Sequence, residues 1–88
     1  MLIPSLGVTV LNGDSPGAQI TDEAPNGVAA VAGLHPGDVI NVVDGKPVKT
    51  PMELVAEVSS RAPGSKVKLG YMVRGQWQTE TTAILGNH

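Results

Sequence analysis

Most of the chain consists of short runs that are rich in β-branched residues or that alternate apolar and polar residues. Turns rich in glycine and proline separate these runs. Runs of this kind predict strands, because a half-buried strand turns every second side chain toward the core. We expect strands over residues 6–11, 18–23, 39–43, 46–48, 66–69 and 76–84. The pairs Asp44-Gly45 and Arg74-Gly75 predict hairpin turns, since their residue types tolerate positive φ.

Two segments carry helix signals instead. The run over residues 28–32 is short and rich in alanine, and Gly33 follows it as a left-handed cap. A longer helix begins at Pro51, with Thr50 as its N-cap and Glu53 placed to complete a capping box. Two helices with five to six short strands predict an α+β fold. We expect a small, partly open antiparallel β-barrel capped by the two helices.

Composition narrows the fold class further. The 88 residues suffice for one small domain, and the 41% hydrophobic share suits a folded chain. Tyr71 and Trp77 are the only aromatic residues, so the core has to be built from aliphatic side chains. Eleven glycines and seven prolines exclude a helical bundle and favour short strands joined by tight turns.

Charge argues against several classes of function. Six basic and eight acidic residues give a net charge of −2, far from the basic footprint of a nucleic-acid-binding protein. All the basic residues follow position 45, which indicates a solvated acidic face in the first half, or less favourably an ion or ligand site. The longest apolar run, about residues 27–34, is too short to span a bilayer. No signal peptide is visible, and we expect any targeting segment to lie outside these residues.

Candidate catalytic residues form no recognised pattern. The segment over residues 13–17, GDSPG, superficially resembles the nucleophile segment of trypsin-like proteases, but Pro16 replaces the glycine after the serine. His35 and His88 both follow Ser15, whereas that family places its histidine upstream. The turn interpretation is therefore favoured, and we expect no enzymatic activity from this domain by itself.

Metal and cofactor sites are equally poorly supported. The chain has no cysteine, and two histidines far apart in the sequence do not make a metal-ligand spacing. No glycine-rich phosphate-binding motif is present. We expect His35 to lie in an exposed loop, and Asp38 to accept hydrogen bonds from nearby backbone amides. We therefore expect no cofactor and no bound metal.

Four segments follow one another at characteristic spacings. They are residues 33–40 (GLHPGDVI), residues 43–48 (VDGKPV), the pair Glu53-Leu54, and residues 63–67 (PGSKV). Together they resemble a PDZ domain in the circularly permuted order of bacterial HtrA/Deg-type serine proteases. The match covers roughly residues 6–84, and only residues 12–20 carry no feature that aligns.

The resemblance implies a site for carboxyl-terminal peptides. The family's carboxylate-binding loop, x-Φ-Gly-Φ, is matched by Ser5, Leu6, Gly7 and Val8. In this family a peptide adds as an antiparallel strand to a sheet edge. The edge here would be formed by Val8, Thr9, Val10 and Leu11. The peptide carboxylate would then accept hydrogen bonds from the N–H groups of Leu6 and Gly7, with Val8 as a third candidate donor.

The second wall of the groove would be the helix that begins at Pro51. Helical spacing predicts that Pro51, Val55 and Val58 face the peptide, that Met52 reaches the rim, and that Leu54 points into the core. For each valine, ordinary core packing is an equally good interpretation. The expected partners are proteins whose last residue is aliphatic, such as Val, Leu or Ala.

The resemblance also implies a setting for the module. We expect one PDZ domain over residues 1–88, with a core of about residues 5–85, cut from a longer bacterial protein. The leading hypothesis is recognition of substrates or regulators for an HtrA-type serine protease in the periplasm or another extracytoplasmic space. A non-proteolytic adaptor in a secretion system or membrane protein, and a packing-only scaffold that binds no peptide, are the alternatives.

Overall fold

The computed structural model describes residues 1–88 and contains seven strands and two helices. The strands are β1 (Leu2–Ile3), β2 (Val8–Leu11), β3 (Ala18–Glu23), β4 (Val39–Val43), β5 (Lys46–Pro47), β6 (Lys66–Val73) and β7 (Trp77–Ile84). The helices are α1 (Val28–Val31) and α2 (Pro51–Ser59). All strand pairs are antiparallel and follow the order β1-β2-β3-β4-β6-β7, with β5 paired to β4 outside this path.

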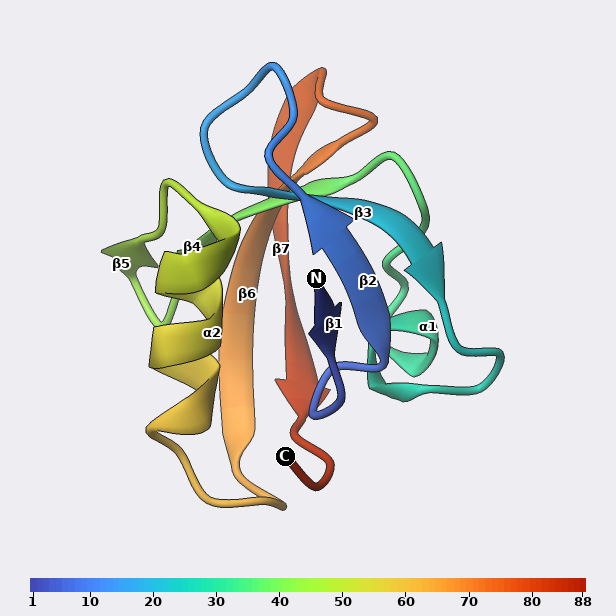
Figure 1. Ribbon diagram of the computed structural model, residues 1–88, viewed down its shortest axis with the longest axis vertical. Coiled ribbons are helices and arrows are strands. Elements are labelled where there is room, and N and C mark those ends of the chain that lie inside the picture. The colour runs from blue at the N-terminus through green and yellow to red at the C-terminus, as the bar shows by residue number, and fades with distance from the viewer.

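The predicted α+β class is confirmed, as a curved antiparallel sheet that does not close into a full barrel. Figure 1 shows α1 and α2 at opposite sides of this sheet, with the long β6–β7 hairpin between them. The bounds predicted for β3 and β4 agree with the structure. Strands β6 and β7 pair over their full lengths, so β6 extends four residues beyond the predicted end at position 69.

The beginning of the chain differs from the prediction. Residues 4–7 form a turn, and the strand predicted over residues 6–11 starts only at Val8. Gly7 has φ +65°, a left-handed value that a strand residue does not adopt. Before this turn lies β1, which the sequence pattern did not predict and which brings the number of strands to seven.

The predicted turns have the expected backbone. Asp44 and Gly45 have φ values of 50° and 82°, and Arg74 and Gly75 have 53° and 69°. Two successive positive φ values match the right-handed twist of the strands that each turn connects. Asp38 is only 2% exposed and accepts bonds from the backbone N–H groups of His35 (2.9 Å) and Arg74 (3.0 Å), which confirms its predicted structural role.

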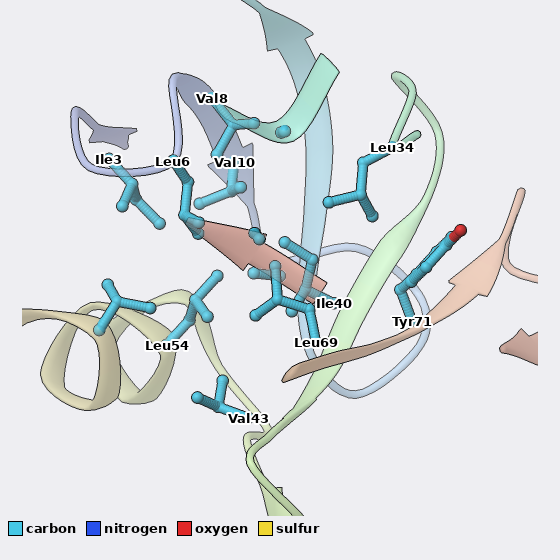
Figure 2. Packing of buried hydrophobic residues seen from close by; sticks show 14 of the residues in the cluster. Ile3, Leu6, Val8, Val10, Leu34, Ile40, Val43, Leu54, Leu69 and Tyr71 are labelled. Carbon is cyan, nitrogen blue, oxygen red and sulfur yellow. The ribbon is translucent and has the colours of Figure 1, made fainter. Parts of the chain in front are cut away.

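The core is aliphatic apart from Tyr71, which is 9% exposed. Its members come from every strand except β5 and from both helices. Figure 2 shows Ile3 and Leu6 pointing into an apolar space that Leu54 of α2 enters from the other side. The first residues of the chain therefore reach the same core as the long helix.

The start of α2 follows its predicted capping chemistry. The Thr50 side chain accepts a bond from the N–H of Glu53 (3.2 Å), and Pro51 occupies the first helical turn. The Glu53 carboxylate accepts from the N–H of Lys49 (3.2 Å) instead of the N-cap residue itself. Both bonds fix the first turn of α2 to the two residues just before it.

Candidate functional site

In the loop that joins β1 to β2, three of the four carbonyl groups are hydrogen-bonded to other parts of the domain. The oxygens of Ser5, Leu6 and Gly7 each accept a hydrogen bond of 2.9 Å. The donors are the backbone N–H groups of Gly86, Ala29 and Ala24, respectively. In a planar trans peptide the N–H points away from the preceding C=O, so this anchoring turns the loop amides in the opposite direction.

Those amides converge on one oxygen atom. The N–H groups of Leu6 and Gly7 both donate to the carbonyl of Ile3, at 3.1 and 2.9 Å, and the Gly7 N–H is shared with the Pro4 carbonyl at 3.2 Å. The positive φ of Gly7 lets the two successive N–H groups point to the same place. A Cβ at Gly7 would make only ordinary contacts, the nearest at 3.6 Å, so the backbone angle rather than space calls for glycine here.

The outer edge of β2 is occupied by β1. Ile3 is opposite Val8 and Leu2 is opposite Thr9 in an antiparallel register. Val10 donates its N–H to the oxygen of Met1 (2.8 Å) and accepts a bond from the Met1 nitrogen (2.9 Å). The edge at which a peptide was expected to add is therefore paired with the first three residues of the chain.

The predicted strand residues divide by face. Val8 and Val10 are each 1% exposed and belong to the core, whereas Thr9 is half-buried and Leu11 is exposed. This alternation is that of a strand with one face packed on the core. On β1 the same alternation gives 2% exposure at Ile3 and 66% at Leu2.

The predicted helix residues lie along one stripe of α2. Pro51, Leu54 and Val58 are buried, and Val55 is half-buried against the core. Met52 is 66% exposed, consistent with a place at the rim. Of the expected wall residues, Pro51 and Val58 are thus shielded from solvent together with Leu54.

The space between β2 and α2 is filled in this structure. None of the five surface hollows is lined by a residue of α2. The 2% exposure of Ile3 accounts for this, because its side chain lies in the same buried cluster as Leu54 and Val58. The candidate site is therefore a groove whose floor and edge are covered by the chain's own first residues.

A charged network holds the far end of α2. Arg61 lies 2.9 Å from the carboxylate of Asp44, at the β4–β5 turn, and also bonds Glu57 of α2. The Nζ of Lys46 lies 3.3 Å from Glu57, and the N–H of Lys68 donates to Asp44 at 2.8 Å. These contacts tie the helix to β5 and β6, away from the loop amides.

The network lowers the pKa of two carboxyl groups. The hydrogen bond from the Lys68 N–H, with Arg61 beside it, lowers the pKa of Asp44 below its usual range. The hydrogen bond from Lys46, again with Arg61, lowers the pKa of Glu57. Both carboxylates therefore stay ionised to lower pH than usual, and they pair with the cations that lie between α2 and the β4–β5 turn.

The residues weighed as catalytic are not brought together. His35 lies 3.6 Å from Glu23, and its side chain is 72% exposed. The Nε2 of His88 lies 2.7 Å from the backbone oxygen of Arg61, at another part of the molecule. The structure contains no group of three or more histidine, aspartate or glutamate side chains arranged to hold a metal ion. None of its helices has the length and hydrophobicity to cross a membrane.

The feature that sequence reasoning missed is β1. Two apolar residues are too few to show a hydrophobic periodicity, and nothing in the local sequence marks Leu2–Ile3 as a strand. The available signal was Pro4 between two apolar stretches, since proline favours the second position of a tight turn. A turn at that point allows the residues before it to fold back along those after it.

Comparison with known proteins agrees with the fold described above. The family model of the PDZ domain matches residues 4–84, so that β1 lies just before the matched region. Serine protease PepD of Mycobacterium tuberculosis is 44% identical over 68 residues, covering 76% of this chain and 15% of that protein. The periplasmic pH-dependent serine endoprotease DegQ of Escherichia coli is 37% identical over 60 residues, covering 68% of this chain and 13% of DegQ.

Solved structures give the same fold. The HtrA-type protease AlgW with decapeptide superimposes with a TM-score of 0.76 at 26% identity, covering 96% of this chain and 28% of that chain. A serine endoprotease from Yersinia pestis gives a TM-score of 0.70 at 26% identity, covering 92% of this chain and 29% of that chain. This chain spans 15% or less of the two curated relatives named above, so the similarity concerns one part of each.

Proposed function

The chain belongs to the PDZ domain family, and on that premise we propose that it binds the carboxyl-terminal residues of partner proteins by β-strand addition. The observation that carries the proposal is the convergence of two backbone N–H groups, those of Leu6 and Gly7, on one oxygen atom beside a strand edge. That arrangement holds a terminal carboxylate without any cationic side chain.

The ligand would run antiparallel to β2, with its last residue opposite Val8. One carboxylate oxygen would take the place that the Ile3 carbonyl occupies here, within reach of the loop amides. The last side chain would enter the apolar space where Ile3 is buried, beside Leu6 and Leu54. Because the side chains around this space are aliphatic, we propose a medium-sized aliphatic final residue such as Val, Leu or Ala.

The carboxylate test compares one peptide in two forms. We expect micromolar binding of a hydrophobic peptide with a free carboxyl end, as is usual for a short ligand that is ordered on binding. Amidation should weaken binding by about 1.5–3 kcal/mol, because charge-assisted bonds to the loop amides are lost. Titration calorimetry that gives equal affinities for the acid and the amide would contradict the role assigned to the loop.

The start of α2 sets a second preference. Pro51 lies where many PDZ domains carry a histidine that bonds a ligand hydroxyl, and its ring offers neither donor nor acceptor. A Thr two residues before the ligand's end would lose water there without gaining a partner, a cost of about 1–3 kcal/mol if fully buried. Fluorescence-anisotropy competition should favour Val over Thr at this position, and a tenfold advantage for Thr would reject the proposed helix register.

The setting is proposed from the relatives. PepD and DegQ are bacterial serine proteases, and DegQ is named as periplasmic. We place this module in an extracytoplasmic HtrA-type protease, where it recognises substrates or regulators for a separate catalytic domain. Sequencing the parent gene tests this, since a Gly-Asp-Ser-Gly-Gly segment with histidine and aspartate upstream is expected before the module. Without that segment, the adaptor function is the better interpretation.

A further inference from the structure

The groove of this domain has an occupant in its own chain. We propose that residues 1–3 are an intramolecular ligand that competes with partner peptides, an inference that rests on the peptide-binding function proposed above. Three observations carry it, namely the pairing of β1 with β2, the burial of Ile3, and the use of the loop amides by the Ile3 carbonyl.

The pairing reproduces what strand addition requires. Met1 and Val10 exchange two backbone hydrogen bonds, and Ile3 lies opposite Val8, next to the loop. The segment runs toward the loop as a carboxyl-terminal peptide would, with Ile3 in the place of the last residue. The bond from the Met1 nitrogen to Val10 is one that an ordinary peptide N–H at that position would also make.

The next residue makes this mimicry compatible with a continuing chain. A free ligand would place its second carboxylate oxygen where Ile3 is instead joined to Pro4. The nitrogen of Pro4 carries no hydrogen, so it brings no further donor to a loop that already presents N–H groups. Proline also presets φ for the second position of the turn that the bond from Leu6 N–H to the Ile3 oxygen closes.

The side chain of Ile3 anchors the segment in the groove. It is 2% exposed, whereas Leu2 beside it is 66% exposed, so the segment is fastened mainly at one residue. Because only a few residues tether it to β2, its effective concentration at the groove is in the millimolar range or above. A partner peptide would have to displace it, and the apparent affinity falls by the fraction of molecules in which the groove is open.

The first test compares two serine substitutions on β1. Ile3→Ser removes the apolar anchor, and Leu2→Ser changes an exposed neighbour as the matched control. Anisotropy with a labelled peptide ending in free Val should show about tenfold tighter binding for Ile3→Ser, the gain expected if β1 closes the groove nine-tenths of the time. Leu2→Ser should bind as the parent chain does. Equal or weaker binding by Ile3→Ser, with the fold intact by circular dichroism, would overturn the proposal.

A reversible clamp keeps the test valid if Ile3→Ser unfolds. Because Met1 and Val10 form the hydrogen-bonded pair, Leu2 and Thr9 form the closer, non-hydrogen-bonded pair, which lies within disulfide reach. The chain has no other cysteine to interfere. Oxidised Leu2→Cys/Thr9→Cys protein should not bind the peptide, and dithiothreitol should restore binding. Equal binding in both redox states overturns the proposal.

Hydrogen exchange separates this inference from the function on which it rests. The Val10 N–H should exchange about tenfold more slowly in the free parent chain than in Ile3→Ser, as closure for nine-tenths of the time implies. Peptide binding together with an unprotected Val10 amide in the parent chain would reject the intramolecular ligand and leave the proposed function standing. No peptide binding by any variant, the reduced clamp included, would reject the proposed function and the competition with it.

Discussion

Two strands of only two residues lie at edges of this sheet, and they are held there by different means. Both β5 residues, Lys46 and Pro47, are exposed, and their pairing with β4 follows from the turn at Asp44 and Gly45. Strand β1 is also followed by a turn, whose Leu6 and Gly7 N–H groups donate to the Ile3 oxygen, but it buries Ile3 in the core as well. The pairing of β5 thus rests on its turn alone, whereas the pairing of β1 combines a turn at residues 4–7 with a side chain buried in the core.

The difference bears on which strand can be replaced. Residues of β5 sit in a hairpin whose backbone angles are set by two adjacent residues, and no ligand could offer the same covalent turn. The contacts of β1 are an aliphatic side chain in an apolar space and a carbonyl on two N–H groups, which another peptide can supply. We therefore regard β5 as part of the scaffold and β1 as exchangeable.

The largest expected effect tests the pocket on which β1 depends. Leu54→Ala removes a fully buried side chain from the apolar space that Ile3 enters and should cost about 2–5 kcal/mol of unfolding free energy. Met52→Ala on the same helix is the control, and at this exposed position we expect less than about 0.5 kcal/mol. Urea unfolding in which the two variants agree would show that α2 is rotated relative to this description.

A smaller effect separates the turns that connect the two pairs of strands. Gly7 and Gly45 both have positive φ, +65° and +82°, and neither would meet a close atom on gaining a Cβ. Substitution by Val should cost each turn about 1–2 kcal/mol or somewhat more in backbone strain, measured by urea unfolding. Only Gly7→Val should also weaken peptide binding, because it re-aims the loop amides. Equal loss of binding in Gly45→Val would show that the contrast between the two turns is false.

Much of this fold could be predicted because its signals are local. The bounds of β3 and β4 follow from their residue patterns, and the hairpin at Asp44-Gly45 follows from backbone preference. Asp38 was also readable, since an aspartate after a Pro-Gly turn commonly accepts backbone N–H bonds. Each of these features depends mainly on neighbours in the sequence, apart from the second bond to Asp38, which comes from the distant Arg74.

The rest depends on residues far apart in the chain. Nothing in Leu2 and Ile3 themselves specifies a strand, because β1 exists only where β2 and α2 provide an edge and a pocket. The bonds that anchor the loop to Ala24, Ala29 and Gly86 could not be predicted either, because only the tertiary fold brings those N–H groups to the loop. The peptide-contacting roles of Val55 and Val58 stay predictions until a ligand is bound.

The smallest expected effect concerns acid. The pKa values of Asp44 and Glu57 are lowered in the folded state, so both carboxylates add to the free energy of unfolding above their usual pKa values near 4. This stabilisation is lost as the pH falls through their lowered pKa values in the folded state. For exposed pairs such as Asp44–Arg61 we expect less than about 1 kcal/mol. Thermal melts of Asp44→Asn should therefore lose less stability between pH 7 and pH 3 than the parent chain does.

This acid effect should also distinguish the two edges. The network contacts Lys46 of β5 and no residue of β1. The measurement is hydrogen exchange of the Val48 and Val10 N–H groups, each divided by its intrinsic rate at the same pH. On acidification, this relative rate should rise more for Val48 than for Val10. Equal acceleration at both sites would mean that acid acts on the whole fold rather than on the β5 side.

The most direct test of the account is an experimental structure of this chain with a peptide that ends in free Val. The account predicts the peptide antiparallel to β2, its carboxylate within hydrogen-bonding distance of the Leu6 and Gly7 N–H groups, and Leu2–Ile3 displaced from the edge. A peptide bound elsewhere, or one bound while Ile3 remains paired with Val8, would contradict the account.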